Sequence, residues 1–296
     1  MRVGFLTICL FLGMRSFLHP DQPKYELVVC ALFQDEELFL EEWIAFHRLI
    51  GVEHFYLYNN LSQDRSVEIL APYVREGIVD LFDWPVTAHS EAEYLENIQL
   101  PIYNQLLSKV KKEAKWAAFI DPDEFIVPKR GETLAALLRD YEAYAALAVN
   151  WQIYGTSGWE TIPEGSLLTE TLIWKGEEES SWNQIVKLII QPEYVQQINH
   201  PHFFEYRDGC YAVDTEKRPQ ISGTGAQVLE ISRLQINHYW FGTGSWFKKN
   251  KLPRRSKWGV RLSTEQIEEI MSLYNRVKDL SILPFIPALR RQLGAL

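Results

Sequence analysis

The first half of the chain alternates short apolar runs with amphipathic segments, and this alternation constrains the fold more than any other feature. Leu27–Leu32, His54–Tyr58 and Ile78–Phe82 are typical of buried strands, whereas Asp35–Ile50 and Ser66–Glu76 carry apolar residues at helical spacing. Strands that alternate with helices predict crossover connections and a mostly parallel sheet. Ligands of such sheets bind beyond the carboxyl ends of the strands.

The next apolar run, which begins at Trp116, ends abruptly in Asp121-Pro122-Asp123-Glu124. In extended backbone Asp121 and Asp123 would share one face, and two such carboxylates can hold a hard divalent cation that in turn holds a diphosphate. The alternative is a chance Asp-x-Asp at a strand end or turn. An EF-hand is disfavoured because the required glycine and distal glutamate are missing. The preceding segment, Glu91–Lys112, predicts helix, with Pro101 marking a kink or a second start.

Composition bounds the class of protein. The 296 residues suit one large α/β domain or two small ones, and 47% apolar residues supply a sizeable core. A formal net charge of −9 disfavours a protein that coats nucleic acid. One basic run, residues 248–257, is either a solvated loop or a surface for an anionic ligand such as a diphosphate or a membrane.

The N-terminus and the cysteines bear on location. Val3–Met14 is apolar but shorter than the roughly 20 residues that a membrane span needs, and Arg15 follows without an Ala-x-Ala-like cleavage site. This segment is therefore a membrane anchor, a signal sequence or a part of the fold, and the sequence leaves all three alternatives open. The three cysteines, Cys9, Cys30 and Cys210, form no CxxC pair, which fits a reducing compartment. We expect a cytoplasmic protein that works near the membrane.

The second half has a different pattern. Ala145–Ile153 predicts a strand, and the segments after it indicate a mixed or antiparallel arrangement. Thr264–Lys278 predicts an amphipathic helix that begins with a capping box of Ser263 and Gln266. The expected divisions are an apolar segment and linker (1–24), a first half (25–144), a second half (145–262) and a helical C-terminal segment (263–296).

Several segments, in this order along the chain, resemble glycosyltransferase family 92 and its bacterial relatives. They are Leu27–Leu32 with Gln34-Asp35-Glu36, Glu42-Trp43 with His47, Gly51–Asn60, Gln99 with Tyr103-Asn104, Phe119–Phe125, His200–Phe203 and Asn237–Trp240. The resemblance covers roughly Tyr25 to Lys257. The ordered series is specific, although each motif alone is not.

The resemblance implies a GT-A type α/β fold, with a Rossmann-like nucleotide-sugar half on a mostly parallel sheet and a mixed acceptor half. It also implies transfer of a hexose, with inversion, from a nucleotide diphosphate sugar such as a UDP-sugar to a hydroxyl of a glycan or glycolipid. The implied cofactor is a divalent metal, Mn²⁺ or Mg²⁺. One departure is Asn59, where relatives commonly have aspartate; asparagine can still bind a base or ribose but brings no charge.

The candidate site residues come from these motifs, from the ends of the predicted strands and from the basic run 248–257. Asp123 is the expected direct metal ligand, and Asp121 binds the metal through water or holds the ribose. His238 is the candidate ligand from the second half, the alternative being a core histidine. The residues expected at the nucleotide sugar are Asn59, Asp64, Gln99, Asn104, Asp121 and the lid residue Lys248, which would close with Lys249 and Lys251 over the diphosphate.

Inverting transfer needs a general base that takes the acceptor proton. Glu160, after the loop at Gly155–Trp159, and Asp208, in a predicted turn, are the two candidates. The tryptophans expected either as acceptor platforms or as core are Trp151, Trp159 and Trp182. For His200 and His202, the favoured interpretation is a hydrogen-bonded structural pair rather than a contact with metal or acceptor.

Two other functions remain as alternatives. The first is a catalytically silent nucleotide- or glycan-binding module of the same fold, for which Asn59 is a hint and the Asp121/Asp123 pair a counterargument. The second is a glycoside hydrolase that uses Asp123 and Glu124. Neighbouring strand residues point to opposite faces, so this pair is poorly placed to flank one bond.

Overall fold

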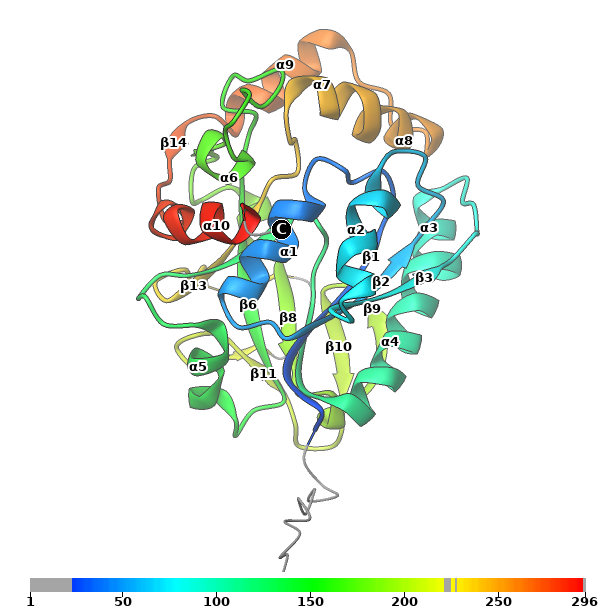
Figure 1. The fold of residues 1–296 in the computed structure, drawn as a ribbon, viewed down its shortest axis with the longest axis vertical. Helices are drawn as coiled ribbons and strands as arrows, with labels where there is room; N and C mark the ends of the chain where they lie inside the picture. The colour runs from blue at the N-terminus through cyan, green and yellow to red at the C-terminus, as the bar shows by residue number, and fades with distance from the viewer. Residues whose placement is uncertain (1–22, 221–224, 227, 295–296) are drawn as a thin grey trace, which may run out of the picture.

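A computed structural model describes residues 23–220, 225–226 and 228–294. It is built around a ten-stranded sheet with the order β12-β11-β6-β8-β4-β1-β2-β3, to which β13 and β5 are added beside β6 (Figure 1). The strands of this sheet are β1 (Tyr25–Phe33), β2 (His54–Asn59), β3 (Val79–Asp83), β4 (Ala114–Phe119), β5 (Glu124–Pro128), β6 (Ala146–Ile153), β8 (Val186–Ile190), β11 (Ala212–Val213), β12 (Pro219–Gln220) and β13 (Leu234–His238).

The first half forms the predicted parallel sheet. β1 lies between β2 and β4 and runs parallel to both, and β3 pairs in parallel on the outer side of β2. The crossovers are α1 (Leu40–Leu49) and α2 (Ser66–Arg75), followed by α3 (Glu91–Tyr94), the π-helix η1 (Leu95–Gln99) and α4 (Leu100–Glu113). Pro101 therefore marks a new helical segment, as one of the two predicted options.

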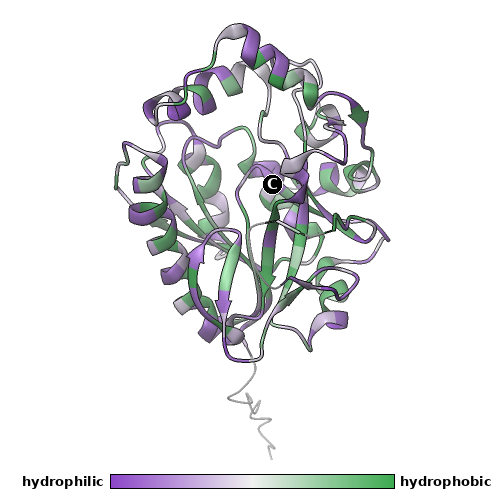
Figure 2. Ribbon diagram, turned by 180° about the vertical axis from the view of Figure 1, so that it is seen from behind, coloured by the Kyte–Doolittle hydropathy of each residue, from purple (hydrophilic) through white to green (hydrophobic). Residues whose placement is uncertain are grey.

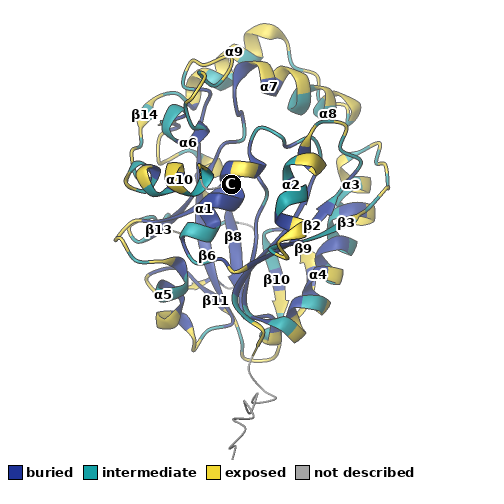
Figure 3. Cartoon of the chain, viewed as in Figure 1, coloured by how far each residue is buried: buried dark blue, intermediate teal, exposed yellow. Residues whose placement is uncertain are grey.

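The alternation of side chains along β1 builds two cores. Val29 and Ala31 belong to the core under α1 and α2, whereas Val28 and Cys30 belong to the core under α4. All four residues are fully buried. The apolar strands at the centre of the molecule are visible in Figure 2, and their burial in Figure 3.

The second half is mixed, as predicted. β8 is antiparallel to both β4 and β6, and β6 is parallel to β11 and β13. β13 is also antiparallel to β5, with His238 opposite Glu124. The sheet therefore continues across the expected division at residue 145. The predicted α/β fold class is confirmed.

The remaining elements surround this sheet. Two antiparallel pairs, β9 (Val195–His200) with β10 (Phe203–Tyr206) and β7 (Trp174–Lys175) with β14 (Val277–Lys278), form separate small sheets. The helices are α5 (Leu134–Leu138), α6 (Leu168–Thr171), α7 (Gly244–Trp246), α8 (Leu252–Lys257), α9 (Thr264–Leu273) and α10 (Ile286–Leu293), and the short 3₁₀ or π turns are η2 (Arg139–Tyr141), η3 (Ser181–Gln184), η4 (Pro192–Tyr194), η5 (Phe247–Lys251) and η6 (Leu283–Phe285).

Two predicted helices are shorter than expected. α1 begins at Leu40 rather than Asp35, because Asp35 adopts a positive φ of 57° and the Glu36 carbonyl closes a turn with the amide of Phe39. α9 begins with the predicted capping box at Ser263 but ends at Leu273. The predicted continuation to Lys278 is wrong, since Val277 and Lys278 pair with β7 instead.

Within the described ranges, no helix combines the length and the apolar character that crossing a bilayer requires. The apolar segment Val3–Met14 lies outside the described residues.

Candidate active site

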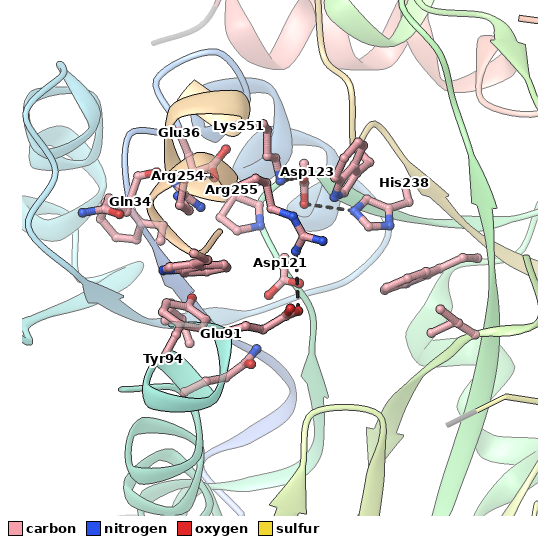
Figure 4. Close-up of a pocket in the computed structure, with 18 of the residues that line it drawn as sticks. Gln34, Glu36, Glu91, Tyr94, Asp121, Asp123, His238, Lys251, Arg254 and Arg255 are labelled. Carbon is pink, nitrogen blue, oxygen red and sulfur yellow. Dashed lines mark hydrogen bonds and ion pairs between the residues drawn. The ribbon is translucent and has the colours of Figure 1, made fainter. Parts of the chain in front are cut away.

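A pocket of about 350 Å³ lies beyond the carboxyl ends of β1 and β4, where the parallel sheet predicts a ligand site (Figure 4). Glu36 enters it from the segment after β1, and Asp121 and Asp123 enter from the segment after β4. His238 comes from the last position of β13, and Lys251 comes from the helical segment above the sheet. The pocket therefore gathers charged groups from four separate parts of the chain.

The acidic pair lies in a turn rather than in extended backbone, so the predicted strand geometry is wrong here. The Asp121 carbonyl accepts a bond of 3.0 Å from the Glu124 amide, and the Asp121 amide donates at 3.0 Å to the Glu124 carboxylate. Proline at position 122 suits this reversal, because its ring restricts φ. Both aspartates nevertheless line the pocket.

Asp123 is only 2% exposed and lies between two basic groups. The Lys251 Nζ donates to Oδ2 at 2.7 Å, and the His238 Nε2 lies 3.5 Å from Oδ1. Burial raises the pKa of Asp123, but Lys251 and His238 outweigh it and hold the pKa below its usual range. Burial lowers the pKa of His238, which favours the neutral imidazole that a metal ligand requires.

Asp121 has a basic partner of its own, Lys187 of β8, which is 1% exposed. The Lys187 Nζ donates to Asp121 Oδ2 at 2.9 Å and lies 3.6 Å from Glu124 Oε1. Burial lowers the pKa of Lys187, yet the two carboxylates raise it above its ordinary value. The acidic turn therefore rests on a buried ammonium group.

Glu36 is a third acidic group at the pocket. Its carboxylate is buried, its Oε2 has no hydrogen-bond partner, and its Oε1 lies 4.0 Å from the Arg254 guanidinium. Burial first, and then the neighbouring aspartates, raise the pKa of Glu36 to about 8, despite Lys251. Arg254 itself is held by the carbonyl of Gln34 at 2.7 Å.

Fitting a metal to this site depends on the donor set. Asp123 Oδ1 and His238 Nε2 face each other at 3.5 Å and supply one oxygen donor and one nitrogen donor. Mn²⁺ or Mg²⁺ would need further oxygen ligands from a bound molecule. Across the part of the chain that the structure describes, no group of three His, Cys, Asp or Glu side chains has the spacing of a metal site. Among the described residues, Asp123 and His238 therefore form a partial ligand set.

Among the six residues predicted at the nucleotide sugar, Gln99 and Asp121 line the pocket, whereas Asn59, Asp64, Asn104 and Lys248 do not. Asn59 bonds Asp83 and the amide of residue 62. Asp64 accepts the amides of residues 37 and 66. Asn104 exchanges two bonds with the backbone of residue 198, which joins α4 to β9. These three side chains are engaged in structural bonds.

The predicted lid and base residues are also separated from the pocket lining. Lys248 is exposed and pairs with Glu160 at 3.0 Å, whereas Lys251, one helical turn later, lines the pocket. Asp208 is exposed in the turn between β10 and β11. The structure brings together Asp121, Asp123, His238 and Gln99 but leaves Glu160 and Asp208 outside the lining.

Aromatic side chains form the second-half wall of the pocket. Trp151, Trp182 and Trp240 line it, whereas Trp159 does not. The His202 amide donates to His200 Nδ1 at 3.1 Å, which is the structural contact that the sequence favours.

Sequence reasoning missed Lys187 and Glu36 as pocket or near-pocket groups, and it named Arg254 only as part of the basic run 248–257. Lys187 carries a detectable signal, because it is a single lysine inside the apolar run Val186–Ile190. Glu36 lies in a segment already quoted for the family resemblance, but its burial depends on the turn before α1.

The chain belongs to glycosyltransferase family 92, whose family model matches residues 25–277. A family 92 protein of Ricinus communis is 25% identical over 269 residues, which is 86% of this chain and 42% of that protein. A galactan β-1,4-galactosyltransferase of Arabidopsis thaliana is 30% identical over 113 residues, which is 37% of this chain and 22% of that enzyme. The chain thus spans less than half the length of these curated relatives.

Among solved structures, the chain is similar to Staphylococcus aureus TarS in complex with UDP. That likeness has a TM-score of 0.36 and 14% identity, and it covers 56% of this chain and 47% of the solved chain, TarS 1–349.

Proposed function

We propose that this protein is a glycosyltransferase that moves a hexose from a nucleotide diphosphate sugar, in the first place a UDP-sugar, to a hydroxyl of a glycan or glycolipid. The observation that carries the proposal is the buried contact of Asp123 with both His238 and Lys251, at the carboxyl edge of the sheet in a family 92 chain. Transfer proceeds with inversion in this proposal, as the family resemblance implies.

Asp123 and His238 would hold a divalent ion, Mn²⁺ or Mg²⁺, with the donor diphosphate completing its ligands. Such an ion would neutralise negative charge on the leaving diphosphate. Asp121 is turned toward Lys187, so its role is to hold the ribose or a metal-bound water rather than to bind the metal directly. Gln99 reaches the same pocket and contacts the donor in this proposal.

The protein supplies its own positive charge for the leaving group. Two cations that line the pocket beside its acidic groups are Lys251 and Arg254, both from the helical segment above the sheet. Departure of a nucleoside diphosphate concentrates negative charge at this point, and fixed cations there lower the barrier. Lys251 must leave Asp123 Oδ2, at least in part, when it binds a phosphate.

For the general base, we retain Glu160 ahead of Asp208. Glu160 accepts from Lys248 at 3.0 Å, and its carbonyl accepts from the amide of Ser245, so it is attached to the same segment that carries Lys251. Movement of that segment would carry Glu160 with it. Asp208 lies in the turn after β10 and has no such connection.

A donor screen tests the proposal. The protein is incubated with UDP-, GDP- and CMP-sugars, with Mn²⁺ or with chelator, and released nucleotide is quantified alongside calorimetric binding of UDP. We expect Mn²⁺-dependent release from one donor, lost in Asp123→Asn and retained in Asp140→Asn, an exposed aspartate paired with Arg233. Binding of UDP without turnover of any donor would favour the silent binding module. Absence of both would refute the transferase proposal.

A further inference from the structure

A second cavity, of about 280 Å³, lies directly beside the candidate active site. Its walls are apolar side chains from η5, α8, α9 and the segment that joins α8 to α9, with Phe247, Leu262, Ile270 and Leu273 among them. Within its described lining, Arg255 is the only charged residue. A cavity with such walls disfavours water and sugar and favours a hydrocarbon.

Three side chains line both this cavity and the active-site pocket. They are Trp182, Trp240 and Arg255. The two indoles meet edge to face at 5.4 Å and form the partition, and the guanidinium lies at the junction. The two cavities therefore adjoin along these three side chains.

Among the described residues, the apolar face of α9 is only partly buried against the core. No residue of α9 is buried, although Ile267, Ile270 and Met271 lie on its inner side. Leu273 is 45% exposed and Trp182 is 37% exposed at the rim. Soluble chains seldom leave a large apolar surface of this kind uncovered unless it receives a partner or ligand. In Figure 3 the α8–α9 end is among the most exposed parts of the molecule.

We propose that this cavity receives the aliphatic tail of the acceptor, which is therefore an amphiphile with its sugar in the polar pocket, an anionic linker at Arg255 and its hydrocarbon under α9. The order of the protein surface, polar pocket then cation then apolar cavity, matches the order of groups in such a molecule. Arg255 has one carboxylate neighbour, Glu91 at 3.5 Å, and this exposed pair is weak enough to yield to a phosphate. The proposal rests on the transferase function, since it specifies that site's acceptor.

The test uses n-alkyl phosphates of four to ten carbons, below their critical micelle concentrations, in calorimetric titrations without donor. We expect the Kd to fall by up to about fourfold for each methylene that enters the cavity, followed by a plateau when the cavity is full. Leu273→Glu, which places a charge at an already exposed rim position, and Leu262→Trp, which fills the cavity, both abolish the dependence on chain length. Ser272→Glu adds the same charge one position away, outside the lining, and preserves it.

Binding that does not depend on chain length, or that is unchanged in both cavity variants, overturns the proposal. The proposal is also overturned if the protein binds no alkyl phosphate and forms a dimer in sedimentation experiments that Leu273→Glu abolishes. In that case the apolar face of α9 would pack against a second copy of the chain. UDP binding with Mn²⁺ is measured on the same samples. Retained UDP binding with no tail binding refutes the acceptor inference alone, whereas a wild type that neither binds UDP nor releases nucleotide from any donor refutes the transferase function.

Discussion

Replacing Lys187 by methionine removes the ammonium group beneath the acidic turn while nearly preserving the volume of the side chain. Lys187 is 1% exposed and lies 2.9 Å from Asp121 Oδ2 and 3.6 Å from Glu124 Oε1. Glu124 is fully buried, and Asp121 is 31% exposed. The substitution therefore removes the counter-ion of two carboxylates, that of Glu124 inside the protein and that of Asp121 at the protein surface.

The expected loss of stability follows from this geometry. Breaking a buried ion pair costs about 3–5 kcal/mol, and we expect the lower end, about 3 kcal/mol, because Asp121 can be solvated and Glu124 can take up a proton. Burial first, and the adjacent aspartates next, already raise the pKa of Glu124 above its ordinary range. With an unfolding entropy of about 2.1 cal/mol/K per residue, this loss lowers the Tm by roughly 5 °C.

Lys115→Met is the matched control. Lys115 of the neighbouring strand β4 also lies between two carboxylates, Glu26 at 3.0 Å and Glu142 at 2.6 Å, but it is 31% exposed. Solvent-exposed pairs contribute about 0–1 kcal/mol, so we expect a small shift in urea unfolding. The double variant Lys187→Met/Glu124→Gln should recover part of the loss, because it removes the stranded buried charge.

Equal destabilisation by Lys187→Met and Lys115→Met would refute this reasoning, since burial would then not determine the cost of the lost ammonium. A double variant no more stable than Lys187→Met alone would show that Glu124 does not depend on Lys187. Circular dichroism at 222 nm during urea unfolding measures all four proteins under identical conditions.

Two further predictions concern other buried carboxylates. Glu42→Gln should lower the free energy of unfolding in urea by about 2 kcal/mol, because the Glu42 carboxylate accepts hydrogen bonds from the amides of Leu168 and Thr169 at 2.8 Å, and the glutamine NH2 would face one of these donors. The control Glu41→Gln changes an exposed residue and should leave stability unchanged. Equal effects of the two substitutions would contradict this prediction. Glu36→Gln should become progressively more stable relative to wild type as the pH rises from about 4.5 to 8. The raised native pKa of Glu36 means that the native state keeps a proton which the unfolded state releases, so wild-type stability falls across this window; a pH-independent difference in metal-free unfolding would contradict it.

Much of the framework was predictable because it depends on local patterns. The parallel order of β1, β2 and β4 follows from alternating strands and helices, and that order alone brings the carboxyl ends of β1 and β4 to one pocket. Asp121 and Asp123 were expected there for this reason. His238 was placed through the family resemblance, and its position at the end of β13 is consistent with that expectation.

What the sequence did not reveal depends on contacts between distant segments. Lys187 reaches Asp121 only because β8 inserts antiparallel beside β4, and no local pattern specifies that pairing. Lys251 rather than Lys248 enters the pocket because of the helical phase of η5, which contains a π-turn. Asn59 was expected in the cleft as a residue at a strand end, but Asp83 of the edge strand β3 holds its amide.

The register between β5 and β13 has a consequence for how such a chain can diverge. Because Glu124 and His238 are opposite each other in a hydrogen-bonded ladder, the spacing between His238 and the acidic turn is maintained by backbone pairing. Segments such as 155–182 lie outside that ladder and can lengthen, shorten or change composition while the pair keeps its place. In the proposed transferase, acceptor preference could therefore change through the surrounding loops while the pairing of His238 with the acidic turn is kept.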